Sequence, residues 1–182
     1  MNTENRLEIE VKIKVQLPDP WRQKIELLPA ALEAERVFEE NIVFDTTQKR
    51  LKKQGILLRL RQQGARAILT MKTPVQENSI YKIREETEVE VSDFASMEKI
   101  IRAIGFQVFF IYQKYREVFT VPGAHIMIDE TPIGNFIEIE GNPDRIDAVA
   151  ARLGFTAADY ITDSYYRLFF LSGRSGHMVF LE

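Results

Sequence analysis

The chain has 182 residues, 45% of them hydrophobic and 28% charged, which is long enough for one well-buried domain but short for two. Its formal net charge of −3, from 24 basic and 27 acidic residues, argues against a general nucleic-acid-binding protein. The absence of cysteine excludes disulfides and thiolate metal sites, and with no apolar run before the first strand we expect a cytoplasmic protein that does not enter a membrane.

Alternating polar and apolar residues predict strands along most of the chain. The connections between them are short enough for mainly antiparallel pairing, and a turn containing Gly64 makes the third and fourth strands a hairpin. In chain order, the predicted strands occupy residues 7–13, 36–44, 56–62, 66–72, 81–91, 106–121, 124–129 and 136–140.

Helices are predicted at some of the connections. The first has Asp19 as its N-cap and Pro20 at its first position, includes Leu32 among its apolar residues, and is broken in two by Pro29. The later helices begin at polar capping residues, and the predicted limits are Thr46 or Thr47 to Gly55, Asp93 to Gly105, Asn142 to Gly154, and Thr162 or Asp163 to Leu171.

The first strand separates charge from apolar surface. Because side chains alternate between the two faces of a strand, Glu8, Glu10 and Lys12 share one face and Ile9 and Val11 share the other. The same alternation gives the other strands a charged face, which carries Arg59, Arg61, Arg66, Lys72, Lys82, Arg84, Glu86, Glu88, Glu90, Lys114, Arg116, Asp129, Glu138 and Glu140.

A solvated sheet face explains any one of these strands, since antiparallel sheets commonly expose one polar side. It does not explain the whole set, because glutamates two residues apart recur in several strands and repel one another unless a cation neutralises them. We therefore predict that the sheet curls into a barrel or tunnel whose charged lumen holds a metal ion and an anion, while amphipathic helices cover its apolar face.

The segment Glu8-x-Glu10-x-Lys12 resembles the signature of the CYTH domains, or triphosphate tunnel metalloenzymes. Further segments resemble the family in the same order along the chain, and they are Phe44-Asp45-Thr46, Leu58-Arg59-Leu60-Arg61, Leu69-Thr70-Met71-Lys72, Arg84-Glu85-Glu86-x-Glu88, Lys114-x-Arg116, Ile128-Asp129, Gly134-x-Phe136-x-Glu138-x-Glu140 and Ser164-Tyr165.

This resemblance implies an α+β fold with an eight-stranded antiparallel β tunnel, a closed barrel with a charged lumen, covered by helices. Residues 1–171 are then a single CYTH-like domain, and residues 172–182 are a C-terminal tail without chemistry of its own. The implied ligand is a small-molecule triphosphate, held with Mg²⁺ or Mn²⁺, because these hard cations prefer carboxylate oxygens. Neither nucleic acid nor a membrane is an expected partner, and a homodimer is left open.

The resemblance also assigns roles to residues. The implied metal ligands are Glu8, Glu10, Glu88, Asp129, Glu138 and Glu140. The implied phosphate clamp, in which guanidinium groups contact two oxygens at once and ammonium groups add compact charge, is Lys12, Arg59, Arg61, Lys72, Arg84, Lys114 and Arg116. The candidate catalytic residues are Lys12, which orients the leaving or attacking oxygen or simply binds phosphate, and Glu10 and Glu138, of which one accepts the proton from water.

Two reactions are compatible with this set. The favoured one is metal-dependent hydrolysis of inorganic tripolyphosphate or of an organic triphosphate such as thiamine triphosphate. The alternative is a class IV adenylyl cyclase, which forms cyclic AMP and pyrophosphate from ATP and needs an adenine site, for which Ile68, Met127 and Phe136 are the candidates. A non-catalytic triphosphate-binding module is the third possibility. Tyr165 and Tyr166 match a family position near one tunnel mouth, where substrate contact and helix packing explain them equally well.

Overall fold

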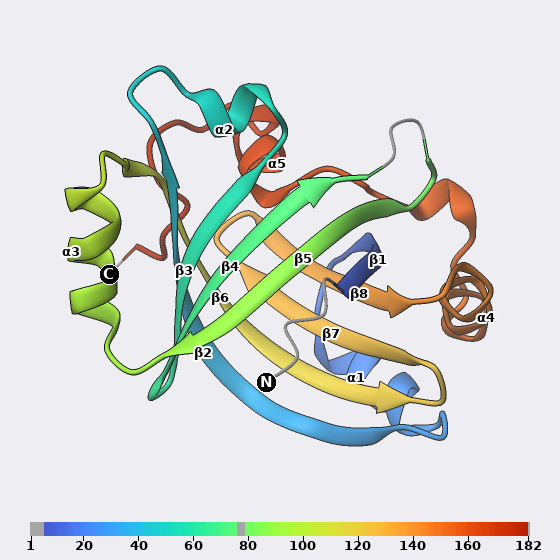
Figure 1. Cartoon of the computed structure of the whole chain (residues 1–182). Helices are drawn as coiled ribbons and strands as arrows, with labels where there is room; N and C mark the ends of the chain where they lie inside the picture. Colours follow the sequence, from blue (N-terminus) through green and yellow to red (C-terminus); the bar gives the residue numbers. More distant parts are fainter. Residues whose placement is uncertain (1–5, 76–78, 182) are drawn as a thin grey trace.

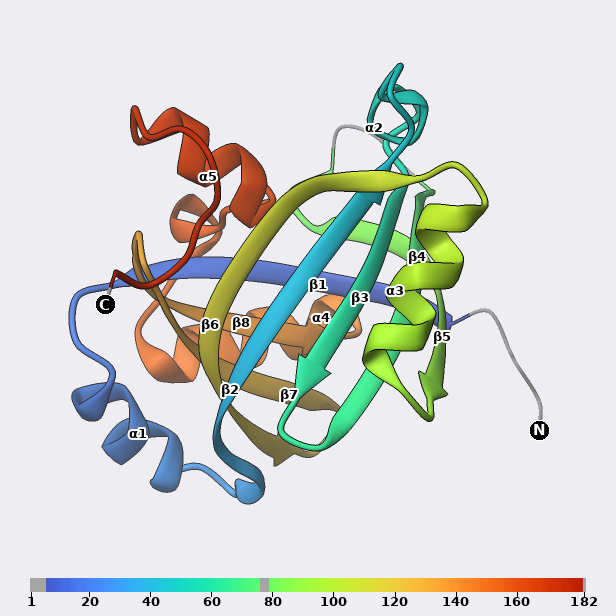
Figure 2. The same ribbon diagram turned by 90° about the vertical axis from the view of Figure 1, so that its left-hand side faces the viewer.

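Eight antiparallel strands form a closed barrel in the order β1-β5-β4-β3-β2-β6-β7-β8, which confirms the predicted fold class (Figures 1 and 2). The computed structural model describes residues 6–75 and 79–181; residues 1–5 and 182, at the ends of the predicted domain and tail, and residues 76–78 lie outside the described residues. The strands are β1 (Arg6–Val15), β2 (Ala31–Asp45), β3 (Leu57–Gln63), β4 (Arg66–Pro74), β5 (Lys82–Val91), β6 (Gln107–Val121), β7 (Ala124–Thr131) and β8 (Gly134–Gly141). The helices are α1 (Asp19–Glu26), α2 (Arg50–Lys53), α3 (Phe94–Ala103), α4 (Pro143–Leu153), the 3-10 turn η1 (Ala157–Asp159) and α5 (Tyr165–Leu171).

The strand register places charged residues of neighbouring strands beside one another on the inner face. Glu10 of β1 lies opposite Lys82 of β5, and Lys12 lies opposite Glu138 of β8. Opposite charges at such positions attract, so they favour this register over a slipped one. On its β8 side, however, Glu10 also lies opposite Glu140, which brings two carboxylates together.

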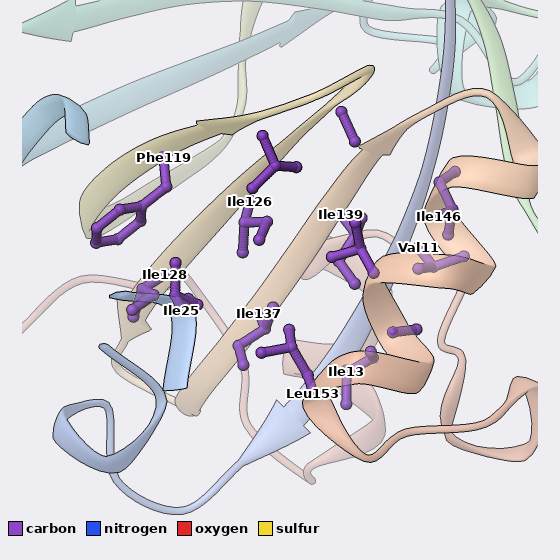
Figure 3. Packing of buried hydrophobic residues seen from close by; sticks show 14 of the residues in the cluster. Val11, Ile13, Ile25, Phe119, Ile126, Ile128, Ile137, Ile139, Ile146 and Leu153 are labelled. Carbon is purple, nitrogen blue, oxygen red and sulfur yellow. The ribbon is translucent and has the colours of Figure 1, made fainter. Parts of the chain in front are cut away.

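The largest apolar core lies outside the barrel wall, where α1 and α4 cover β1, β7 and β8 (Figure 3). Ile25 of α1 and Ile146 and Leu153 of α4 pack in one cluster with Val11 and Ile137 of the sheet. Full burial of one such side chain contributes about 1.5–3 kcal/mol. The apolar cluster therefore stabilises the barrel from outside, while the charged side chains of the strands line the cavity within.

Two smaller cores complete the cover of the barrel. Ile101 of α3 packs with Phe44 and Leu60 of β2 and β3, and Phe169 of α5 packs with Phe110 of β6. Asp93 is the N-cap of α3, as predicted, since its carboxylate accepts a hydrogen bond from the Ser96 N–H.

The segment after α5 is part of the folded wall. Met178 is fully buried, its N–H donates to the carbonyl of Ile111, and its carbonyl accepts from the N–H of Gln113. Ile111 also donates its N–H to Nδ1 of His177. The tail therefore adds a short bridge to β6 and packs beside α5.

The predicted start and length of the first helix are wrong. Pro18, not Asp19, is the N-cap, because its carbonyl accepts the first helical hydrogen bonds and leaves Asp19 and Pro20 in the first turn. The helix ends at Glu26 without a second piece after Pro29. Leu32 lies in β2, which begins five residues before the predicted strand because residues there pair with β6.

Two other caps differ from the prediction. Lys49 is the N-cap of α2, in a left-handed conformation with φ 53°, rather than Thr46 or Thr47, although the hydroxyl of Thr46 accepts a hydrogen bond from the first helical N–H, that of Arg50. The free N–H groups of Leu51 and Lys52 instead bond to the carboxylate of Asp45. For α5 the cap is Ser164 rather than Thr162 or Asp163. Across the described residues, no helix is long and apolar enough to cross a membrane.

We expect Met178→Ala to lower the free energy of unfolding by about 2–5 kcal/mol, because it leaves a cavity under α5. Leu181→Ala is the matched control, since Leu181 is 96% exposed and its removal changes stability by less than about 0.5 kcal/mol. Urea unfolding of both variants measures this. Equal free energies of unfolding for the two variants would mean that the segment after α5 does not stabilise the barrel.

Candidate active site

The barrel encloses a cavity of about 600 Å³ that is lined by eleven basic and seven acidic side chains. The cavity wall is thus positively charged, although the chain as a whole carries −3. All seven residues of the predicted clamp line it, namely Lys12, Arg59, Arg61, Lys72, Arg84, Lys114 and Arg116. Of the predicted metal ligands, those that line it are Glu8, Glu10, Glu88, Glu138 and Glu140.

Lys12 lies at the centre of the acidic residues. Its Nζ is 2.6 Å from Oε1 of Glu10 and 3.3 Å from Oε1 of Glu138, and Nζ of Lys82 also lies 2.6 Å from Glu10. Burial lowers the pKa of Lys12, but the two carboxylates outweigh burial and raise this pKa above its ordinary value. Burial likewise raises the pKa of Glu10, and Lys12 and Lys82 lower it well below the usual range. Lys12 is therefore a fixed ammonium.

Glu8 and Glu140 are less completely neutralised. Nζ of Lys72 donates to Oε1 of Glu8, whereas the buried Oε2 of Glu8 has no hydrogen-bond partner among the described residues. Burial and the charges of Glu8 and Glu10 raise the pKa of Glu140 to about 7, although Arg6 opposes them. Glu140 is paired with Arg6 at 2.5 Å, so the feature that this pair of carboxylates offers a cation is the free oxygen of Glu8.

These residues fit a divalent cation that is only partly bound by the protein. No group of three or more His, Asp or Glu side chains converges as a complete metal site in the part of the chain that the structure describes. Mg²⁺ commonly binds one or two carboxylates and takes its other ligands from water and phosphate. The open oxygen of Glu8, close to Glu140, offers such a partial site.

The basic residues are held by buried partners. Arg59 donates to the hydroxyl groups of Tyr112 and Thr70, at 3.2 and 3.1 Å. Arg116 donates through Nε and Nη2 to the carboxylate of Asp129, at 2.6 Å each, and Nη2 lies 2.6 Å from Glu138. Guanidinium groups fixed in this way keep their planes aligned for a bound anion.

Asp129 lies behind the cations and does not line the cavity, unlike the other predicted metal ligands. It is fully buried and accepts hydrogen bonds from Lys114, Arg116 and the hydroxyl group of Tyr165. Burial and the charge of Asp129 keep the pKa of Tyr165 well above its ordinary value, so its hydroxyl stays a donor. In this arrangement Asp129 orients Lys114 and Arg116.

Glu39 was missed by the sequence analysis. It is fully buried, and its two oxygens lie 3.6 Å from Nζ of Lys114 and 3.7 Å from Nη1 of Arg61, without a hydrogen bond to either. Burial raises its pKa, but Lys114 and Arg61 outweigh this and lower it to about 2. Asn41 is also fully buried and accepts from Arg61. The alternation of the predicted strand at 36–44 was a signal that placed Glu39 and Asn41 on one face.

Other positions differ from their expected use. Lys82 and Glu86 line the cavity, and their charged-face parity was the signal, although neither was assigned a role. Ile68, Met127 and Phe136 are buried but do not line the cavity, so they are not placed to flank a base there. Ser164, Tyr165 and Tyr166 all line it.

A model of the CYTH domain family matches residues 6–165. A Methanocaldococcus jannaschii protein named as a candidate adenylate cyclase is 29% identical over 134 residues, which are 72% of this chain and 76% of that protein.

Solved structures share the fold. The PH1819 protein of Pyrococcus horikoshii is 26% identical with a TM-score of 0.75, and 92% of this chain aligns with 99% of that one. A candidate adenylate cyclase from Vibrio parahaemolyticus has a TM-score of 0.81 at 21% identity, and the match covers 91% of this chain and 99% of that one. A candidate adenylyl cyclase from Hippeastrum is described as having a dominant triphosphatase activity. Its TM-score is 0.66 at 20% identity, and the match covers 92% of this chain and 97% of that one.

We expect Glu39→Gln to destabilise the protein at pH 7 by about 3 kcal/mol, because it removes a charge that buried Lys114 and Arg61 need. The native pKa of Glu39, about 2, lies below the ordinary 4.5. Its contribution is therefore complete above pH 4.5 and is lost as the pH falls toward 2. Urea unfolding between pH 7 and pH 2 should show the curves of the wild type and the variant converging.

The matched control is Glu40→Gln, since the next residue on β2 lies outside the cavity and bonds to Gln113. It should follow the wild type at every pH. A constant difference between Glu39→Gln and wild type down to pH 2 would contradict the assigned ionisation of Glu39.

Proposed function

This chain belongs to the CYTH domain family, and on that basis we propose that it binds a triphosphate in the barrel and hydrolyses one of its phosphoanhydride bonds with Mg²⁺ or Mn²⁺. The observation that carries the proposal is the composition of the barrel cavity, where eleven basic and seven acidic residues share the lining and Oε2 of Glu8 has no hydrogen-bond partner among the described residues. A triphosphate supplies the negative charge that balances the basic lining, and a divalent cation bound with it supplies a partner for the free oxygen of Glu8.

In the proposed reaction, Arg59, Arg61 and Arg116 bind phosphate oxygens through the guanidinium N–H groups that their protein partners leave available, and Lys114 adds a compact charge. Lys12, a fixed ammonium between two carboxylates, places positive charge at the oxygen that leaves or attacks. These groups are in position before substrate enters, so little reorganisation is needed as charge develops.

The metal would be held by Glu8 with Glu10, Glu138 or Glu140, and Glu88 is a further candidate. Bound there, it would supply charge neutralisation at the phosphoryl oxygens and a more acidic water molecule. Glu10 or Glu138 remains the proposed proton acceptor. Asp129, which is enclosed by its own three hydrogen-bond donors, is better suited to orienting Lys114 and Arg116 than to binding metal.

A second candidate is cyclisation of ATP to cyclic AMP and pyrophosphate. It is supported by the apolar and aromatic residues that line one part of the cavity, since they offer an organic group a place to bind. The two reactions share the clamp and the metal, and they differ in which phosphorus is attacked. The proposed partner in both is a small molecule rather than a nucleic acid or a membrane.

One assay separates the possibilities. The purified chain with Mg²⁺ or Mn²⁺ is incubated with tripolyphosphate, thiamine triphosphate or ATP, and phosphate, pyrophosphate and cyclic AMP are measured. We expect metal-dependent release of phosphate. Cyclic AMP with an equal amount of pyrophosphate would establish the cyclase instead, and metal-dependent binding without any product would leave a binding module.

We expect Glu8→Gln to lower kcat by about 100-fold or more while leaving the protein folded, since loss of a metal-binding group costs at least as much as loss of a group that supports one. Oε2 of Glu8 has no hydrogen bond to lose, and Lys72 keeps Glu86 as a partner at 3.0 Å. Circular dichroism and phosphate release measure both properties. Glu90→Gln is the control and should stay active, because Glu90 is outside the cavity lining and pairs with exposed Arg66. An active Glu8→Gln variant would remove Glu8 from the metal site.

A further inference from the structure

Glu39 and Asn41 are two fully buried residues of β2 that lie beside the phosphate clamp but do not line the cavity. Figure 2 shows β2 between β6 and β3, the strands that carry Lys114 and Arg61. Glu39 lies opposite Lys114 in the strand register. Asn41 lies opposite Arg61. The proposed reaction uses the two cations but gives Glu39 and Asn41 no part.

Glu39 differs from the other buried anion beside Lys114. Asp129 accepts a hydrogen bond from Nζ of Lys114 at 2.9 Å, which fixes the ammonium group. The oxygens of Glu39 lie 3.6 Å from Nζ of Lys114 and 3.7 Å from Nη1 of Arg61, beyond hydrogen-bond distance. Arg61 instead donates from Nε to Oδ1 of Asn41 at 3.2 Å. Glu39 therefore acts on both cations through its charge rather than by orienting a hydrogen bond.

The charge of Glu39 is present at neutral pH and reaches the cavity lining. Burial raises the pKa of its carboxyl, but the clamp cations outweigh burial and lower this pKa to about 2. Lys114 and Arg61 both line the cavity, with side chains that are only 2% and 12% exposed. At such low exposure, solvent screens the charge of Glu39 poorly from that of a phosphate bound in the cavity. The two anions therefore compete for the same two cations, and each weakens the binding of the other.

We propose that Glu39 is an internal competitor of the bound phosphates, whose charge weakens the hold of Lys114 and Arg61 on them so that product leaves the barrel. This inference rests on the proposed function, since it takes the lumen as the phosphate site. A clamp without this competitor would bind substrate and product alike more tightly, and tighter binding of both raises affinity without raising turnover. Glu39 thus sets the affinity of the clamp.

Calorimetric titration of the full chain in the presence of Mg²⁺ tests the proposal. The ligands are pyrophosphate and a tripolyphosphate analogue in which methylene groups replace the bridging oxygens. We expect Glu39→Gln to bind both about tenfold more tightly than the wild type, since it removes one negative charge beside the shared cations. Inhibition of phosphate release by pyrophosphate should strengthen by the same factor. A merely structural role of Glu39 predicts the opposite sign, because misplaced cations bind anions more weakly.

Asn41→Asp is a second variant, with the opposite expectation. It places a carboxylate beside Arg61, and the Nδ2 group that it removes has no hydrogen-bond partner among the described residues. We expect it to bind both ligands about tenfold more weakly than the wild type. Glu39→Asp keeps the charge and should bind them like the wild type. Because the two main variants change the charge in opposite directions, misfolding of one leaves the other as a test.

Glu40→Gln is the matched control, because the next side chain of β2 lies outside the cavity lining and accepts a hydrogen bond from Gln113. It should bind both ligands like the wild type. Urea unfolding with and without pyrophosphate checks the fold, and pyrophosphate should stabilise Glu39→Gln more than the wild type because it binds that variant more tightly. Equal or weaker binding by a folded Glu39→Gln variant, or equal or tighter binding by Asn41→Asp, would overturn the proposal.

Failure of the inference and failure of the proposed function give different results. Phosphate release from tripolyphosphate with unchanged affinities in both variants would contradict the role of Glu39 alone. The expected changes in affinity, in a chain that releases phosphate from no triphosphate, would keep the role of Glu39 and contradict the hydrolase. A wild type that binds neither ligand would contradict both.

Discussion

Closure of a barrel around ionised side chains requires every buried charge to have a partner, because an unpaired ion in a dry interior is far more costly than a paired one. The strand register meets this requirement by setting Lys82 and Glu138 beside Glu10 and Lys12. Where a buried carboxylate oxygen that faces the cavity has no donor among the described residues, at Glu8, a ligand gains most by binding. The folded state and the proposed metal-triphosphate complex are thus two solutions to the same electrostatic constraint.

Buried carboxylates outside the cavity lining complete this arrangement. Asp129 and Glu39 flank Lys114 from two sides, the first at 2.9 Å and the second at 3.6 Å. Both are fully buried, and neither lines the cavity. They keep the wall cations in place without presenting negative charge directly to an anion. A lumen of cations alone would attract a triphosphate more strongly, but mutual repulsion would oppose folding.

The sequence was sufficient for the parts of the structure that depend on strand parity. The alternation around Glu8, Glu10 and Lys12 and the family resemblance together predicted a closed antiparallel barrel, and every clamp residue lines its cavity. The alternation of side chains shows which face of a strand a residue is on, but not how far along the barrel it lies. Phe136 and Met127 therefore lie on the inner side yet do not reach the cavity, and Asp129 lies behind its partners.

Other features depended on tertiary contacts that a single strand or helix does not encode. Leu32 is part of β2 because it pairs with Phe119 of β6. Asp45 bonds the α2 backbone from six and seven residues away, a distance at which local capping rules do not apply. The apolar part of the cavity lining joins residues of β3, β6 and α5, and Glu39 could be recognised only once its strand was placed opposite Lys114.

Pairing of β1 with β8 affects how the chain folds into the closed barrel. Val11 pairs with Ile139 where the first and last strands meet, so the barrel cannot close during synthesis until about three quarters of the chain has been made. Contacts between such distant residues slow folding. Until then, the unclosed lumen is an ionic surface rather than an apolar one, and ionic surface does not promote association of partly folded chains. The charges that line the finished cavity therefore add no apolar surface to a chain whose barrel is still open.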